Sequence, residues 1–239
     1  MNVLVFSSAM TESDFALYQN NAKIKPNPSN QNFYNNLIKA LAFRNNVSVV
    51  SHRPLTKGMF KEKYFEAEEN KEGNANFYYT YIEAGKVYKL LREQNEIIKR
   101  AHKAIEDFHS NDFVIVTDTL RLSLLTAARK IASEFNVKIV GMLTDNPDNL
   151  SFRRKSYVHH LRRNIKQLDG YLSLSDGLVQ VFNGYKPSYV FEGLVDSPNL
   201  FKKDPIYDYF FFAGSLYERY GVKTLVDAFH ASNIKSKLI

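Results

Sequence analysis

Two aspartates close short apolar runs in the middle of the chain, where a carboxylate could bind a ligand or move a proton. Asp118 follows the apolar residues of 112–120, and Asp145 those of 137–146. Residues 121–135 between them carry apolar side chains at helical spacing. We expect two parallel strands covered on both faces, because both runs are continuous and apolar. Open α/β sheets bind ligands outside the carboxyl ends of their strands, so Asp118 and Asp145 are the first candidate functional residues.

Each aspartate also has a purely structural interpretation, in which its side chain caps the helix that follows. For Asp118 the two interpretations carry equal weight. For Asp145 the functional one is favoured, because Pro147 follows too closely for Asp145 itself to be the cap.

Composition excludes several classes of protein. With 239 residues and 44% hydrophobic residues, the chain can form one large or two small domains with a real core. It has no cysteine, which excludes disulfides, thiol catalysis and zinc-thiolate sites. We find no signal-peptide pattern and no apolar run near the ~20 residues of a membrane span. We therefore expect a cytoplasmic protein, either soluble or peripheral at the inner face of the membrane.

Strands alternate with helices along the whole chain, which predicts an α/β fold with a doubly wound parallel sheet. Residues 11–30 are polar and rich in asparagine, and we expect a long exposed loop there, followed by a helix over 30–44 capped by Ser29. We expect a solvated connection over 52–76. The other expected strands cover 2–6, 47–51, 77–82, 170–174 and 188–191, and the other expected helices 86–108, 152–166 and 175–182.

The domain prediction places a Rossmann-like domain at 1–195, a linker at 196–207 and the beginning of a second domain at 208–239. The last part holds one strand, a helix over 221–231 and the start of a further strand. We expect this second domain to be incomplete.

A basic segment follows Asp145. Residues 152–166 interleave arginine, lysine and histidine with apolar residues at helical spacing, which predicts a helix with a wide cationic face. One interpretation is a solvated surface helix. The other is an interfacial helix that meets an anionic membrane or an anionic acceptor through Arg153, Arg154, Arg162 and Arg163, and the net charge of +7 agrees with an anionic partner. We do not expect nucleic acid as a partner.

Other polar residues also follow predicted strands. Ser7 and Ser8 follow the first strand, Asn146 follows Asp145, and Glu192 follows the strand at 188–191. With Asp118, they are our candidate substrate-binding residues.

Residues 212–229 resemble the start of the donor domain in family 4 retaining glycosyltransferases of the GT-B fold. In that family a strand ends in glycine and a small or basic residue, a short turn carries a basic residue, and a helix begins at a glycine. Residues 168–176 and 189–196 look like the last two strands of the family's amino-terminal domain, and 143–147 lie where the family has its interdomain cleft.

The resemblance implies transfer of a sugar from a nucleotide-diphosphate sugar to a glycan or lipid-linked acceptor, in cell-surface polysaccharide or glycoconjugate synthesis. It implies no cofactor and no metal, with the nucleotide sugar as co-substrate. Donor phosphate would meet Gly214, Ser215 and Arg219. Asp145 stands where many members have a histidine, and is the candidate for contact with the reacting sugar or for general base.

This sequence departs from the family in three ways. Ser215 replaces a frequent arginine, the loop after the first strand lacks glycines, and the family's paired-glutamate segment has no counterpart in the chain. We therefore expect this chain alone to be inactive. The alternative function is a non-catalytic module that pairs with a subunit supplying the donor domain. A Rossmann dehydrogenase is disfavoured, because no Gly-x-Gly-x-x-Gly follows a strand.

Overall fold

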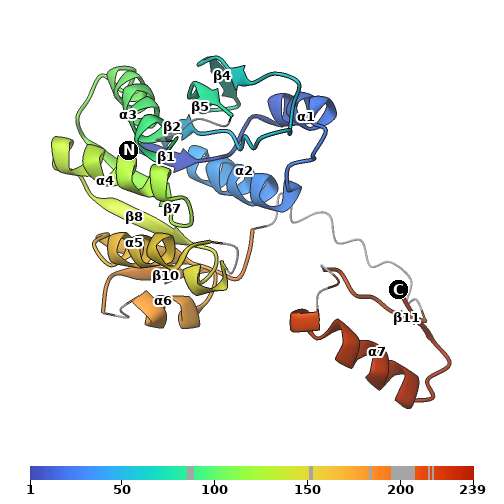
Figure 1. Ribbon diagram of the computed structural model, residues 1–239. Coiled ribbons are helices and arrows are strands. Elements are labelled where there is room, and N and C mark those ends of the chain that lie inside the picture. Colours follow the sequence, from blue (N-terminus) through green and yellow to red (C-terminus); the bar gives the residue numbers. More distant parts are fainter. Residues whose placement is uncertain (85–88, 151–152, 183–184, 195–207, 215, 217) are drawn as a thin grey trace. The chain divides into compact units, whose positions relative to one another are not determined.

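The computed structural model describes the chain except for residues 85–88, 151–152, 183–184, 195–207, 215 and 217 (Figure 1). Contacts divide the chain into two compact units, Met1–Asp196 and Ser197–Ile239. Each unit is described by itself. Among the described residues, no helix is long and apolar enough to cross a membrane.

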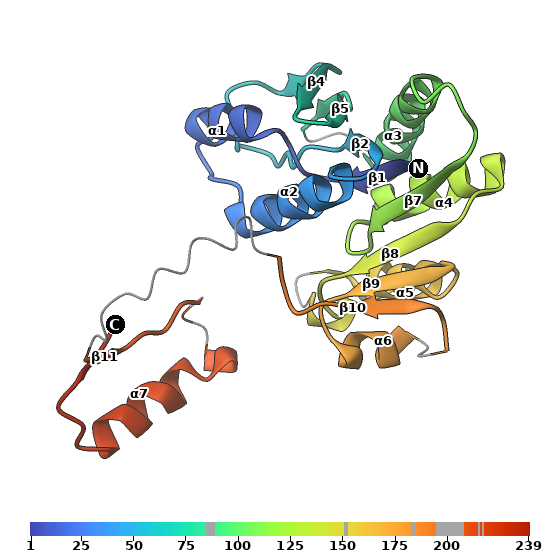
Figure 2. The ribbon, with the colours of Figure 1, turned by 180° about the vertical axis from the view of Figure 1, so that it is seen from behind.

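The first unit is built on an eight-stranded sheet with the order β10-β9-β8-β7-β1-β2-β5-β4. All neighbouring strands are parallel except β4, which runs antiparallel to β5 at one edge. Figure 2 shows β8, β9 and β10 side by side. The strands are β1 (Asn2–Ser7), β2 (Asn46–Ser51), β4 (Glu69–Glu72), β5 (Ala75–Tyr79), β7 (Phe113–Asp118), β8 (Ile139–Leu143), β9 (Gly170–Ser173) and β10 (Ser188–Val190).

Helices cover both faces of this sheet, and the strand pattern explains why. In β1 the side chains of Leu4 and Phe6 belong to one hydrophobic cluster, and those of Val3 and Val5 to another. Successive strand residues point to opposite faces, so a continuous apolar strand needs cover on both. On the Leu4 side lie α3 (Lys89–Glu106), α4 (Leu122–Phe135), α5 (Lys155–Ile165) and α6 (Asp176–Phe182), and on the Val3 side α1 (Glu12–Asn21) and α2 (Pro28–Ala42).

This architecture confirms the doubly wound α/β fold. The strand order reverses at β1, which lies between β2 and β7, so the carboxyl ends of these strands flank the crevice where such sheets bind ligands. Ser175 caps the start of α6, since its Oγ accepts a hydrogen bond from the Leu178 N–H at 3.3 Å.

Three local predictions were wrong. Residues 12–21 form α1 instead of an exposed loop, because Thr11 caps the Asp14 N–H at 3.2 Å and Tyr18 is buried. The next helix begins at Pro28, not at residue 30, and its cap is Asn27 instead of Ser29. Residues 52–76 are not only a solvated connection: they contain β4 and also β3 (Tyr64–Phe65), which pairs antiparallel with β6 (Ile82–Glu83).

The second unit is small and has little interior. Strands β11 (Tyr209–Phe210) and β12 (Lys237–Leu238) pair in parallel, and the connection between them contains a 3₁₀ turn (Glu218–Tyr220) and α7 (Val222–Ala231). Gly221 adopts a positive φ of 76° immediately before α7, a conformation that glycine reaches without strain. No described residue of α7 is buried.

Candidate functional site

Ser7 and Asp118 end the two central strands at the carboxyl edge. Phe6 pairs with Thr117 in the ladder between β1 and β7, so the two polar residues lie at neighbouring positions. Ser7 is fully buried, and its Oγ accepts a hydrogen bond from the Ala9 N–H at 3.2 Å. Its position therefore serves the turn after β1, and its contact with substrate stays a prediction.

Side chains occupy the backbone donors of the loop after β1. The Met10 N–H donates to Gln31 Oε1 at 3.0 Å, and the Thr11 N–H donates to the Tyr79 hydroxyl at 2.9 Å. With the Ala9 N–H bound to Ser7, three successive donors have partners within the protein. In this conformation the loop does not offer these N–H groups to a phosphate, in agreement with its lack of glycine.

Asp118 is buried, with 5% of its surface exposed. Burial raises the pKa of its carboxyl group, while the Leu120 N–H, donated to Oδ1 at 2.8 Å, and the Arg121 cation oppose that rise. The nearby Tyr34 hydroxyl makes no hydrogen bond of standard geometry among the described residues. Burial raises the Tyr34 pKa well above its usual value, and the Asp118 charge raises it further. Asp118 thus holds the turn that leads into α4.

An open cleft of about 420 Å³ lies beyond the carboxyl ends of β1, β2 and β7, in the volume range of small-molecule sites. No carboxylate is among the described residues that line it, whereas three cations are. Its polar lining includes Lys25, Arg121, Arg153, Ser8, Asn27, Asn30 and Gln31, and its apolar lining includes Met10, Phe15, Ile24, Leu55 and Met59.

The two arginines of the cleft are held near the start of α4. Arg121 Nη1 donates to the His52 carbonyl at 2.6 Å, which joins the end of β2 to the residue before α4. The Arg153 guanidinium lies 5.1 Å from the centre of the Tyr157 ring. The Tyr157 hydroxyl in turn accepts the Leu122 N–H at 3.0 Å. These contacts orient two positive charges toward one region of the sheet edge.

Sequence reasoning identified Ser8 and Arg153 of this cleft but missed Lys25, Asn30, Gln31 and Arg121. Ser8 Oγ accepts a hydrogen bond from Asn30 Nδ2 at 3.0 Å, so the start of α2 helps to position it. Arg121 carried a usable signal, because it follows the strand end at Thr117–Asp118. The residues from 25–31 gave no such signal, since they were assigned to a loop and its adjoining helix.

Asp145 lies outside the lining of the cleft. It is exposed, and its Oδ1 accepts hydrogen bonds from the Asn146 N–H at 2.7 Å and from Asn149 Nδ2 at 2.8 Å. Asn146 caps the 3₁₀ turn Pro147–Asn149 by accepting the Asp148 N–H at 3.1 Å. Glu192 is exposed beyond β10. The catalytic role of Asp145 and the substrate contacts of Asn146 and Glu192 stay predictions.

Most of the basic segment forms a helix, as expected, but α5 begins at Lys155, so Arg153 and Arg154 precede it, and residue 152 lies outside the described residues. Arg153, Arg154 and Arg163 are exposed, whereas Arg162 forms an ion pair with Asp148 and lies 5.7 Å from the Phe182 ring centre. Arg129 on α4 lies near Arg163 and extends the cationic surface across two helices. Burial and then the Arg163 charge lower the pKa of Arg129.

In the second unit Gly214 follows β11, while Ser215 and the Arg219 side chain lie outside what the structure describes.

No family model and no curated protein matches the sequence. Among solved structures, sucrose-phosphate synthase from Thermosynechococcus elongatus has a TM-score of 0.59 at 11% identity, with 100% of this chain and 61% of that chain covered. A UDP-forming α,α-trehalose-phosphate synthase from Burkholderia vietnamiensis has a TM-score of 0.47 at 12% identity, with 77% and 42% covered. UGT89C1 from Arabidopsis thaliana, complexed with UDP, has a TM-score of 0.40 at 14% identity, with 82% and 50% covered.

The chain thus spans about three fifths of the length of the synthase. At this level of identity the likeness concerns the fold alone, and the fold is that of a GT-B glycosyltransferase. The Rossmann-like, GT-B class expected from the sequence is thereby confirmed.

Proposed function

We propose that this chain is the acceptor-binding part of a glycosyltransferase. In the proposed reaction the enzyme transfers a sugar from a nucleotide-diphosphate sugar to an anionic acceptor. The observation that carries the proposal is the cleft beyond β1, β2 and β7, whose described lining includes Lys25, Arg121 and Arg153 and no carboxylate. A lining with this balance of charge favours a ligand that carries phosphate or carboxylate. The GT-B fold supplies the reaction class by analogy.

The acceptor in this proposal is a phosphate-bearing glycan or lipid-linked sugar, and the pathway makes cell-surface polysaccharide or glycoconjugate. The apolar wall of Met10, Ile24, Leu55 and Met59 suits the carbon skeleton of such a molecule, while the amides of Asn27 and Asn30 suit its hydroxyl groups. The family 4 assignment and the retaining stereochemistry belong to the same proposal.

Asp145 is our candidate for contact with the reacting sugar or the acceptor hydroxyl. Its exposure leaves one carboxylate oxygen available, since both hydrogen bonds that it accepts from described residues go to Oδ1. A role as general base would require this free oxygen to lie within hydrogen-bond reach of the acceptor hydroxyl.

The test of the transfer reaction is mass spectrometry of products after the complete gene product is incubated with a panel of nucleotide sugars and membrane extract. A hexose or related mass added to an anionic acceptor supports the proposal. Arg121→Met/Arg153→Ala should lose most of this product, whereas Arg44→Ala, an exposed cation outside the cleft, should keep it. Transfer only to neutral acceptors would contradict the anionic assignment.

A second candidate is a non-catalytic module that pairs with a separate donor-domain subunit. Phe211 and Leu216 of the second unit are 70% and 80% exposed, and α7 has no buried residue. Such a surface favours a polypeptide partner that covers it. Copurification of a donor-domain protein with the natural gene product would support this candidate, and sugar transfer by the purified gene product alone would contradict it.

The second partner that we propose is an anionic membrane. In this proposal the protein is cytoplasmic, and α5 holds it at the inner face of the membrane. The exposed Arg153 and Arg154, which precede α5, and the exposed Arg163 in its last turn could each contribute about 1 kcal/mol near an anionic surface. Membrane attachment would bring the cleft to lipid-linked acceptors.

A further inference from the structure

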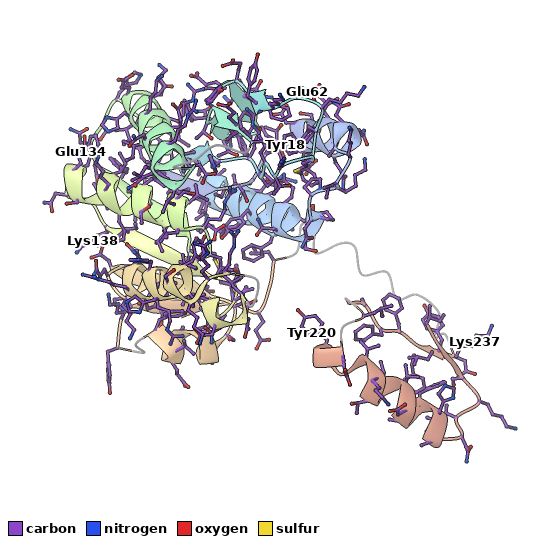
Figure 3. The ribbon with its side chains drawn as sticks, in the orientation of Figure 1. Tyr18, Glu62, Glu134, Lys138, Tyr220 and Lys237 are labelled. Carbon is purple, nitrogen blue, oxygen red and sulfur yellow. The ribbon has the colours of Figure 1, made fainter. Side chains whose placement is uncertain are left out.

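A second and larger pocket, of about 640 Å³, lies between α1 and residues 60–68. Tyr18 and Glu62, labelled in Figure 3, belong to its lining. It adjoins the anionic-acceptor cleft: both include Met10, and the backbone of Lys23 in the pocket donates a hydrogen bond at 2.8 Å to the carbonyl of Met59 in the cleft. The volume is within the range of about 300–1,000 Å³ typical of ligand sites.

Three aromatic rings form one wall of this pocket. The ring centres of Tyr18 and Phe60 are 4.5 Å apart, those of Tyr18 and Phe65 5.2 Å, and those of Phe60 and Phe65 4.9 Å. The Tyr18 hydroxyl donates to the Pro54 carbonyl at 2.6 Å, which fixes the ring. The wall is therefore rigid, and because Tyr18 and Phe60 are only 6% and 7% exposed, a ligand would contact it chiefly at the half-buried Phe65.

Charged groups beside this wall are held in place before any ligand binds. Arg53, 5% exposed, pairs with Glu68, donates to the Glu66 carbonyl at 2.5 Å and lies 4.9 Å from the Tyr79 ring centre. Its Nε is buried and has no hydrogen-bond partner among the described residues. Asp14 Oδ2 accepts the Tyr79 hydroxyl at 2.6 Å.

The rim adds polar groups that are free to bind. The side chains of Asn21 and Glu62 form no hydrogen bond or ion pair with any residue that the structure describes. The lining also balances its charges, with the anions Asp14, Glu62 and Glu68 against the cations Lys23, Arg53 and Lys61. This balance distinguishes the pocket from the cationic cleft and disfavours a phosphate-bearing ligand.

We propose that this pocket binds an uncharged saccharide. Sugar hydroxyls can donate to the carboxylates and accept from the amide, ammonium and guanidinium groups, so one hydroxyl-rich ligand satisfies both signs of charge. The C–H face of a sugar ring packs on an aromatic wall. The site is separate from the acceptor cleft, and saccharide binding here requires neither a nucleotide sugar nor turnover.

The absence of tryptophan from the sequence allows a selective fluorescence test. Leu17 lines the pocket and is 62% exposed, so Leu17→Trp places a single tryptophan at its rim. We expect a saturable emission change when the full chain is titrated with neutral maltopentaose, cellopentaose, chitopentaose or mannopentaose up to about 10 mM. In the Leu17→Trp background, Glu62→Ala should weaken the binding about threefold or more.

Two matched controls give the test its specificity. Glu66→Ala removes an exposed carboxylate of the same segment that does not line the pocket, and it should leave the affinity unchanged. Phe43→Trp, at a 79% exposed position elsewhere on the unit, should report no titration. No saturable signal with any of the four probes would overturn the proposal, as would equal losses in the Glu62 and Glu66 variants. Neither result tests anion binding in the cleft. The effect of the Arg121 and Arg153 variants on the anionic acceptor tests that binding separately.

Discussion

Arg121 donates a hydrogen bond at 2.6 Å to the carbonyl of His52, a residue 69 positions earlier in the chain. This bond joins the carboxyl ends of β2 and β7 across β1 and places a guanidinium in the wall of the cleft beyond these strands. Arg121 therefore has two roles, one in the geometry of the sheet edge and one in the charge of the cleft.

Arg121→Met should separate these roles. We expect the affinity for an anionic acceptor analogue to fall by roughly ten- to a hundredfold, because a charge-assisted contact is worth roughly 1.5–3 kcal/mol. The melting temperature should fall by about 2–4 °C for each kcal/mol lost with the bond to the His52 carbonyl. Calorimetric titration with glucose 6-phosphate and thermal unfolding measure the two effects. Unchanged binding in a folded variant would remove Arg121 from the anion site.

Asp118→Asn should change the pH dependence of stability. Burial raises the pKa of Asp118 in the folded state, so its ionised form is disfavoured there, and its stabilising contribution is present at low pH and lost as the pH rises through the folded pKa. Asparagine stays neutral and can keep the bond from the Leu120 N–H through Oδ1. The stability of the variant relative to wild type should therefore be greater at pH 7 than at pH 3, below the ordinary pKa of an aspartate. Urea unfolding at both values measures this difference, and a constant difference would contradict the burial argument.

Tyr157→Phe should destabilise the first unit by about 1 kcal/mol. The hydroxyl accepts the Leu122 N–H at 3.0 Å and donates to the Leu120 carbonyl at 3.3 Å, so its loss leaves a partly buried helix start without its partner. Tyr189→Phe is the control, since Tyr189 is 67% exposed. Equal melting temperatures for the two variants would show that water replaces the Tyr157 hydroxyl without cost.

The sequence predicted the sheet better than the site. Runs such as 112–118 are apolar throughout, and the burial of both strand faces leaves few alternative structures for them. Helix α1 was missed because its asparagines and its weak apolar pattern suggested a loop, although Thr11 and Asp14 carry the capping signal. The cleft was mostly missed because Lys25, Gln31 and Arg121 come from distant segments, which only the strand order brings together.

Asp145→Asn should leave folding intact and impair the sugar transfer that we propose. Asparagine Oδ1 can still accept from the Asn146 N–H and Asn149 Nδ2, so we expect the melting temperature to change by no more than a few degrees. Loss of a positioned proton acceptor should lower the transfer rate by roughly a hundredfold or more. Steady-state kinetics with the identified acceptor measure this effect. Full activity would leave Asp145 only its role in the turn.

Charge reversal on α5 should abolish selective binding to anionic membranes. Arg154 and Arg163 are the residues to change, because both are exposed, whereas Arg162 already pairs with Asp148. At low salt, wild type should sediment with vesicles that contain phosphatidylglycerol and not with neutral phosphatidylcholine vesicles, and Arg154→Glu/Arg163→Glu should lose this preference. Binding should weaken as salt shortens the Debye length to about 8 Å at physiological ionic strength. Arg44→Glu/Lys237→Glu reverses the same number of charges elsewhere and should retain at least part of the binding. If both double variants lose binding equally, net charge explains the attraction and α5 is an ordinary solvated helix.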